Sequence, residues 1–338
     1  MHAPIGNLRL PLASALVLMM RAGFLSIEGG RVRSKNSINV AQKNLTDLVV
    51  AWVCFMSVGF WLTYGVAMPY AADAAATRTP SAVNPLHFLY QLGFCGTAVT
   101  ILSGSVAERM SFKAYLGLVR VVSGLVYPLV GRPVRGGLFG PVELAWLREL
   151  GFVDFAGSTV VHGVGEWAAL VLVPTIGAGI GRFDEAGRPR PIASHDSVTA
   201  LQGVLVLLVG WIGFDGGALS ISDPRLPDVL IDTLTAAVHG ALAGTLLGRW
   251  LHGGVFHPAA IGSGLIGGLV ACTAGVRLGR RLGVRVLAEG VEKRAQPSML
   301  KDRDCDQVKG FPFARPMSGA SVTELLAARS TDAGRRAA

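Results

Sequence analysis

Long apolar runs alternate along the chain with short polar and basic segments. A run of about 17–25 apolar residues is long enough to cross a bilayer as an α-helix. Eight such spans are predicted, at approximately 8–28, 45–67, 86–107, 113–130, 155–180, 197–219, 229–251 and 259–276. The fourth is short and the eighth is rich in glycine. The pattern therefore predicts an all-α polytopic membrane protein.

Composition agrees with this prediction. Of the 338 residues, 51% are hydrophobic and only 16% are charged, whereas a soluble domain carries about 25% charged residues. With a mean hydropathy of +0.48, the long apolar blocks exclude a disordered chain. The first run lies where a signal peptide would lie, but Arg21 interrupts it and no A-x-A cleavage site follows. We therefore expect a retained helix.

Basic residues in the loops predict the orientation of the chain. One set of alternate loops carries ten of them: Arg31, Arg33, Lys35, Lys43, Arg109, Lys113, Arg182, Arg188, Arg190 and Arg249. The opposite set carries six: Arg9, Arg78, Arg132, Arg135, Arg148 and Arg225. Because positively charged loops stay in the cytoplasm, we expect a multi-pass protein of the plasma (inner) membrane with its N-terminus outside. The net charge of +9 arises from these loops and the C-terminal tail, so we do not expect nucleic acid as a partner.

The four cysteines indicate neither a disulfide framework nor a zinc site. Cys54, Cys95 and Cys272 lie in apolar runs, and no CxxC pair occurs. We expect no cofactor and no resident metal.

The segment DFAGSTVVH, residues 154–162, places two ionisable residues in or near the fifth span. Such residues are costly in a bilayer and indicate a functional site by default. Two interpretations of Asp154 are open and compatible: it caps the helix through backbone N–H groups, or it contacts a ligand. His162 is either part of the same site or a hydrogen-bonding residue between helices.

This segment resembles the signature of the ammonium transporter (Amt/Mep/Rh) family. Three further blocks agree in order and spacing: RSKNSINV at 33–40, SGSVAER at 103–109 and GWIGFDGG at 210–217. The resemblance covers about residues 8–275. It implies a homotrimer with a narrow pore through each protomer, eleven spans per chain, and transport of ammonium or ammonia across the lipid bilayer.

The resemblance also implies roles for particular residues. His162 matches the first of two pore histidines, and a neutral imidazole there passes hydrogen bonds or relays a proton. Phe94 and Phe214 match the stacked aromatic pair that gates the outer pore. Asp154 matches the carboxylate of the outer ammonium site, and Trp211 matches a structural tryptophan beside the second gating phenylalanine.

Several positions depart from the family pattern. Arg135 stands where a tryptophan usually attracts ammonium through its ring face, and we expect its charge to repel the substrate. Ala218 stands where a serine usually helps to bind ammonium. Glu166 lies four residues after His162, so on an α-helix it would share a face with this histidine and could pair with it.

The largest expected departure is truncation. The family has two inverted five-helix repeats plus a final helix, with the pore at their interface. Here the second repeat stops after its third helix, near residues 273–275, and we expect about eight of the eleven spans. The helix with the second pore histidine and the regulatory C-terminal tail would be missing, so we expect no PII-type regulator as partner.

The tail carries a second resemblance. RLGVRVLAEGVE at 281–292, CDQVKG at 305–310 and FARP at 313–316 resemble the last third of an EAL domain, the cyclic di-GMP phosphodiesterase fold. Only Glu289 matches an active-site acid of that fold, where several carboxylates are needed to hold metal. We therefore expect residues 276–327 to form a small α/β remnant without enzymatic activity, followed by a disordered tail at 328–338.

Two further classes of function stay open beside transport. One is an ammonium-sensing membrane domain of a cyclic di-GMP signalling protein, which would need a complete output domain. The other is an inactive fragment of such a protein.

Overall fold

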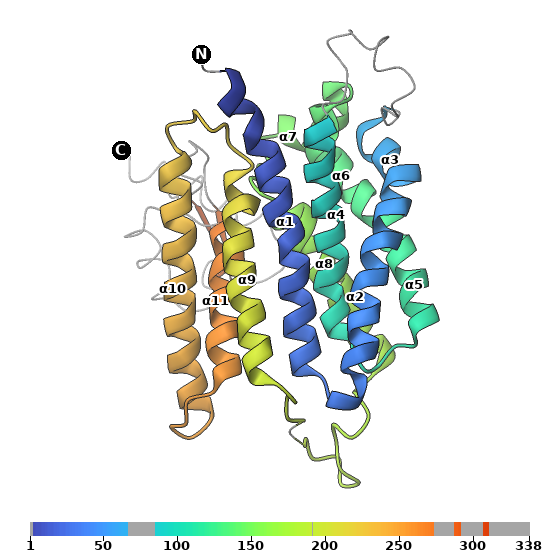
Figure 1. Ribbon diagram of the computed structural model, residues 1–338, viewed down its shortest axis with the longest axis vertical. Coiled ribbons are helices and arrows are strands. Elements are labelled where there is room, and N and C mark those ends of the chain that lie inside the picture. The colour runs from blue at the N-terminus through green and yellow to red at the C-terminus, as the bar shows by residue number, and fades with distance from the viewer. Residues whose placement is uncertain (1–2, 67–84, 191, 274–286, 292–306, 311–338) are drawn as a thin grey trace, which may run out of the picture. The chain divides into compact units, whose positions relative to one another are not determined.

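The computed structural model describes residues 3–66, 85–190, 192–273, 287–291 and 307–310. By its internal contacts the chain divides into two compact units, Met1–Ala274 and Gly275–Ala338. The described part of the first unit is a bundle of helices (Figure 1). These are α1 Ala3–Arg31, α2 Ser34–Cys54, α3 Phe60–Tyr64, α4 Pro85–Val106, α5 Phe112–Val121, α6 Tyr127–Arg135, α7 Trp146–Glu149, α8 Val164–Ile176, α9 Ser197–Gly216, α10 Leu226–Leu251 and α11 Pro258–Thr273.

Three wider π-helical turns join or extend these helices in the described part of the chain. They are Phe55–Gly59, which joins α2 to α3, Val122–Val126, which joins α5 to α6, and Ser158–Gly163, which leads into α8. Short 3₁₀ turns occupy Gly136–Leu138 and Val142–Ala145.

Seven of the predicted spans are confirmed as helices long and apolar enough to cross a membrane. The fourth is longer than the sequence pattern predicted, running from Phe112 to Leu138. The eighth predicted span, 259–276, corresponds to α11, which starts at Pro258 and is described as far as Thr273. Its 16 described residues form an apolar helix.

The long helices run in alternating directions (Figure 1). The start of α1 and the end of α11 therefore lie at the same end of the bundle. The α1–α2, α4–α5, α8–α9 and α10–α11 connections lie at the opposite end. This arrangement gathers the more basic set of loops at one end.

Close backbone contact holds α1 against α9. A Cβ atom added to Gly203 of α9 would lie only 2.5 Å from the carbonyl oxygen of Gly23 in α1. Small residues at such positions let membrane helices approach closely, which compensates for the lack of a hydrophobic drive between helices in lipid.

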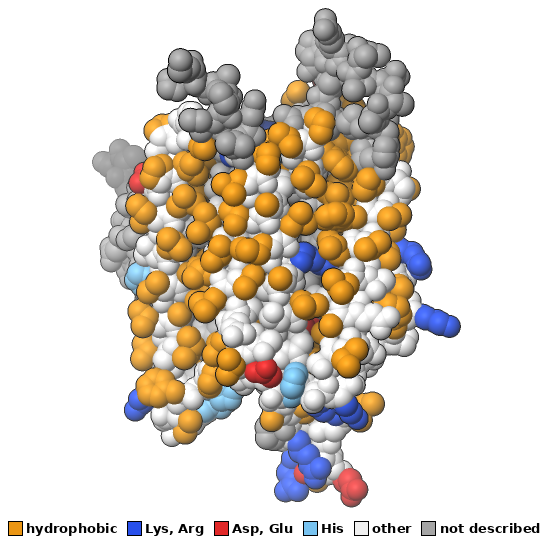
Figure 2. All heavy atoms as spheres, in the orientation of Figure 1, with side chains coloured by type: hydrophobic (Ala, Val, Ile, Leu, Met, Phe, Trp, Pro, Cys, Tyr) orange, Lys and Arg blue, Asp and Glu red, His pale blue; other side chains and the backbone are white. Residues whose placement is uncertain are grey.

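The outer surface of the bundle is apolar. Figure 2 shows hydrophobic side chains over most of one face, with the charged side chains mostly toward its lower end. On α2, Leu45, Val49 and Val53 recur every fourth residue and are each at least 60% exposed. A stripe of exposed aliphatic side chains at helical spacing is typical of a surface that faces lipid.

In the second unit the structure describes two strands, β1 Leu287–Val291 and β2 Gln307–Gly310. They pair in parallel, with Leu287 opposite Gln307 and Ala288 opposite Val308. A parallel pair requires a crossover connection between its strands. The predicted tail at 328–338 lies outside the described residues, as does most of the predicted remnant at 276–327.

Candidate functional site

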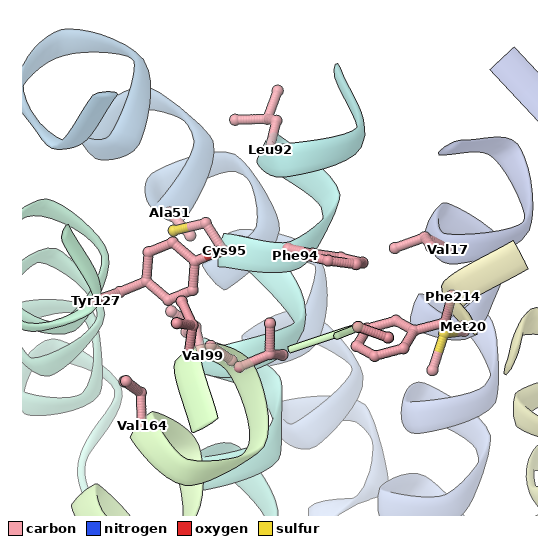
Figure 3. Close-up of a cluster of buried hydrophobic side chains, with 14 of the residues drawn as sticks. Val17, Met20, Ala51, Leu92, Phe94, Cys95, Val99, Tyr127, Val164 and Phe214 are labelled. Carbon is pink, nitrogen blue, oxygen red and sulfur yellow. The ribbon is translucent and has the colours of Figure 1, made fainter. Parts of the chain in front are cut away.

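Two aromatic rings from different helices meet inside the bundle. Phe94 of α4 and Phe214 of α9 have ring centroids 4.5 Å apart and planes inclined by 36°. Figure 3 shows the two rings adjacent, with Met20 of α1 beside Phe214. Both phenylalanines are fully buried. The two positions that the family pattern assigns to an aromatic gate are therefore in contact.

His162 lies next to this pair. It belongs to the π-helical turn Ser158–Gly163 and is only 2% exposed. Its ring stacks on Trp211 at 5.2 Å with an interplanar angle of 11°, and it lies 5.4 Å from the ring of Phe214. Its Nε2 atom has no hydrogen-bond partner among the described protein groups. A buried polar nitrogen of this kind calls for a ligand or solute as its partner.

Asp154 lies just before the π-helical turn and accepts hydrogen bonds from its first residues. The backbone N–H of Thr159 donates to Oδ1 at 2.9 Å, and the hydroxyl of Ser158 donates to the same oxygen at 3.3 Å. Gly157 allows the chain to enter the turn with φ = +103°, a left-handed conformation that suits glycine. Asp154 thus has the capping geometry that the sequence allowed.

The other carboxylate oxygen of Asp154 pairs with Arg135. The guanidinium donates to Oδ2 through Nη2 at 2.7 Å and through Nε at 3.1 Å. Its Nη1 donates to Oε1 of Gln91 at 3.2 Å, and its Cζ atom lies 5.0 Å from the ring centroid of Phe94. The side chains of the ion pair are 8% and 0% exposed. The charge of Arg135 is therefore paired with that of Asp154, a partner that the sequence did not indicate.

A cavity of about 440 Å³ opens above this ion pair. Its lining includes Arg135, Asp154 and Phe94, together with Arg9 and Arg148. Ala218 also lines it, where the family pattern would place a serine hydroxyl. The cavity leads to a column of groups in contact order: the guanidinium of Arg135, then the rings of Phe94, Phe214, His162 and Trp211.

The expected pairing of Glu166 with His162 was wrong. Glu166 is exposed, whereas His162 faces Trp211 in the interior, and no contact joins them in the described structure. The expectation assumed regular α-helical spacing. A π-helical turn holds an additional residue, so positions i and i+4 across it do not share a face as they do on an α-helix.

Two residues of the site were not foreseen from the sequence. Gln91 bonds Arg135, and the hydroxyl of Tyr90 donates to the backbone carbonyl of Phe214 at 2.5 Å. The Tyr90 ring also lies 4.5 Å from that of Phe94. Tyr90 and Phe94 lie four residues apart on α4, and residues at this spacing are neighbours on a helix. This spacing could have indicated that Tyr90 lies beside the aromatic pair. Within the described residues, no group of three or more His, Cys, Asp and Glu side chains is placed to hold a metal ion.

Membrane-length helices around an aromatic and imidazole column beneath a cavity form an architecture that is typical of channels and transporters for small solutes. The chain belongs to the ammonium transporter family: the model of the Ammonium Transporter Family matches residues 9–283. The match extends a few residues beyond the boundary at 275 that the motifs suggested.

Individual relatives agree with this assignment. The chain is 36% identical over 276 residues to the ammonium transporter Amt2 of Archaeoglobus fulgidus, covering 77% of this chain and 57% of that protein. Among solved structures, the Sensor Amt Protein superposes with a TM-score of 0.73 at 33% identity, over 80% of this chain and 68% of the other. Mep2 of Candida albicans superposes with a TM-score of 0.66 at 25% identity, over 79% and 60% of the two chains.

The chain spans about half to two thirds of the length of the curated relatives it matches. The covered share of these relatives is 51%, 57% and 63% for three of them.

Proposed function

We propose that this protein moves ammonium or ammonia across a membrane. The observation that carries the proposal is the column of Phe94, Phe214 and His162 beneath the outer cavity. A constriction lined by aromatic rings strips water from a solute and excludes hydrated ions. The unpartnered Nε2 of His162 then offers the dehydrated solute a hydrogen-bonding group where the surrounding side chains are apolar.

Each site residue has a role in this proposal. Phe94 and Phe214 form the gate, and His162 exchanges hydrogen bonds or a proton with the solute. Asp154 organises the outer end of the path by fixing the start of the π-helical turn, while Trp211 holds the imidazole plane by stacking. No cofactor takes part in this mechanism.

We place the protein in the plasma (inner) membrane with its N-terminus outside. The excess of basic residues in the loops at the opposite end of the bundle supports this orientation. We also propose a homotrimer, in keeping with the family pattern, with the exposed apolar faces of the bundle shared between lipid and neighbouring protomers.

We further infer that residues 276–327 derive from an EAL domain and have no phosphodiesterase activity. The support is that β1 and β2 contain the AEGV and QVKG segments of the two motifs and pair in parallel, as neighbouring strands of a barrel do. Glu289, which lies in β1, is the single match to an acid of that active site, and one carboxylate cannot hold the catalytic metals.

Uptake of radiolabelled methylammonium tests the transport proposal. The chain and its variants are produced in cells that lack other ammonium carriers, with the amount of membrane-inserted protein measured for each. We expect His162→Ala to reduce uptake by about tenfold or more, equivalent to at least about 1.4 kcal/mol, because the buried hydrogen-bonding group is lost.

His239→Ala is the matched control. His239 also lies in a long helix, but it is exposed, and its hydrogen bond among the described residues is with a carbonyl of its own helix, that of Thr235. Its substitution should leave uptake unchanged. Absence of uptake by correctly inserted wild-type protein would refute the proposal.

A further inference from the structure

The guanidinium of Arg135 lies among three groups that each attract a cation. It bonds the carboxylate of Asp154, bonds the amide oxygen of Gln91 and sits over the face of Phe94. A negative charge, a carbonyl dipole and an aromatic face are the groups that recognise a small cation. The guanidinium of Arg135 thus occupies the space between three groups that are each suited to a small cation.

The surroundings oppose binding of a second cation. Besides Arg135, the cavity lining carries two more guanidinium groups, those of Arg9 and Arg148, and Asp154 is the only carboxylate among its described residues. Since Asp154 already pairs with Arg135, a cation entering the cavity meets an excess of positive charge. Such a cation can bind the carboxylate of Asp154 only if the guanidinium of Arg135 moves away from it.

The position of the guanidinium is fixed from several sides. Arg135 is the last residue of α6, and its two bonds to Asp154 share one carboxylate oxygen. Gly157 lies close to the same side chain: a Cβ atom there would be 3.4 Å from Nη2 of Arg135. The guanidinium is therefore a built part of the site.

From these contacts we propose that Arg135 is a tethered cation that occupies the outer cation site and that ammonium must displace it in order to bind. The inference rests on the proposed function and names the regulation of that same site. It predicts that the chain binds ammonium weakly, and that loss of the guanidinium exposes a site with higher affinity for small cations.

Thermal unfolding of the purified full-length chain in detergent measures the affinity of each form for ammonium. The unfolding midpoint is recorded against ammonium chloride concentration, with sodium chloride keeping the ionic strength constant, because a ligand that binds the folded state raises the midpoint. We expect the half-saturating ammonium concentration of Arg135→Ala to be about tenfold lower than that of the wild type, or lower still. Millimolar guanidinium chloride should also raise the midpoint of this variant, because it replaces the lost group.

Arg132→Ala is the matched control on the same helix. Arg132 donates to the carbonyl of Leu62 and does not line the cavity, so its loss should not change the response to ammonium. If Arg135→Ala is too unstable to purify, Arg135→Gln replaces it, since glutamine keeps a hydrogen-bond donor without the charge.

The outcomes separate this inference from the proposed function. Equal half-saturating ammonium concentrations in the wild type and in the Arg135 variants would overturn the proposal that Arg135 occupies the cation site. Methylammonium uptake by the wild type would in that case leave the transport proposal intact. If no form responds to ammonium and the wild type shows no uptake, both proposals fall.

Discussion

Charged residues inside the bundle are placed in bonded sets. Arg21 of α1 pairs with Asp47 of α2, and the hydroxyl of Tyr115 in α5 donates to the same carboxylate. The side chains of Arg21 and Asp47 are 10% and 0% exposed. A buried charge is tolerated at such a position only when a partner and hydrogen bonds replace its water shell. The sequence marked Arg21 as unusual, but only the packing of α1 against α2 supplied its partner.

Removing one partner of this pair should be strongly destabilising. Asp47→Asn leaves the guanidinium of Arg21 buried without its ion-pair partner, and we expect a loss of about 3–5 kcal/mol in the free energy of unfolding. Thermal unfolding in detergent would measure it as a lower midpoint.

Two variants control that measurement. Thr46→Ala alters the neighbouring position, where a half-buried side chain donates its hydroxyl to the carbonyl of Gln42 in the same helix, and it should have little effect. The double variant Arg21→Met with Asp47→Leu should recover most of the loss, because apolar residues need no countercharge. A double variant as unstable as Asp47→Asn would show that the ion pair is not the cause.

At the scale of elements, π-helical turns decide which side chains of a helix face the interior, and glycines decide how closely two helices approach. The π-helical turn Ser158–Gly163 directs His162 inward while Glu166 stays exposed. Glycines of α10 and α11 bring these two helices into backbone contact: a Cβ atom at Gly264 would lie 2.3 Å from the carbonyl oxygen of Gly240. Small residues therefore hold α11 against α10.

Two glycines of α11 should respond differently to the same substitution. Gly264→Ala places a methyl group against the backbone of α10, and overpacking of this kind costs about 1–3 kcal/mol. Gly267 has no atom within 4 Å of an added Cβ, so Gly267→Ala should be neutral or stabilising by up to about 1 kcal/mol through helix propensity. Unfolding midpoints of the two variants test this. Equal destabilisation of both would contradict close packing of α10 against α11.

On the scale of the whole helix bundle, the alternating helices place the described loops between the long helices at one of two ends (Figure 1). Ser34, at the start of α2, belongs to the more basic end, and Ser222, between α9 and α10, belongs to the other. Both residues are exposed. The distribution of basic residues predicts that the first end lies in the cytoplasm.

Labelling of introduced cysteines tests this orientation. In intact cells, a membrane-impermeant maleimide should label Ser222→Cys and should label Ser34→Cys only after the membrane is opened. The parent chain, with its native cysteines, measures the background in each case. The reverse result would place the N-terminus in the cytoplasm.

Much of the fold was predictable from one sequence because the length of an apolar run, which indicates a membrane-spanning helix, depends only on neighbouring residues in the chain. Seven of eight predicted spans correspond to helices of membrane length, and the eighth corresponds to an apolar helix described over Pro258–Thr273. The contact between Phe94 and Phe214 was anticipated through the resemblance to a family. The partner of Arg135 was not anticipated, since 19 positions separate it from Asp154 along the chain.

The sequence by itself determined that the chain is helical, that it crosses a membrane several times, and to which family it belongs. Hydropathy and short motifs encode these properties residue by residue. Only the tertiary structure decided that Arg135 neutralises Asp154, that His162 stacks on Trp211 and that Glu166 points away. These relations depend on which faces of separate helices meet and on where a helix widens, and neither can be read from the spacing of residues along one chain.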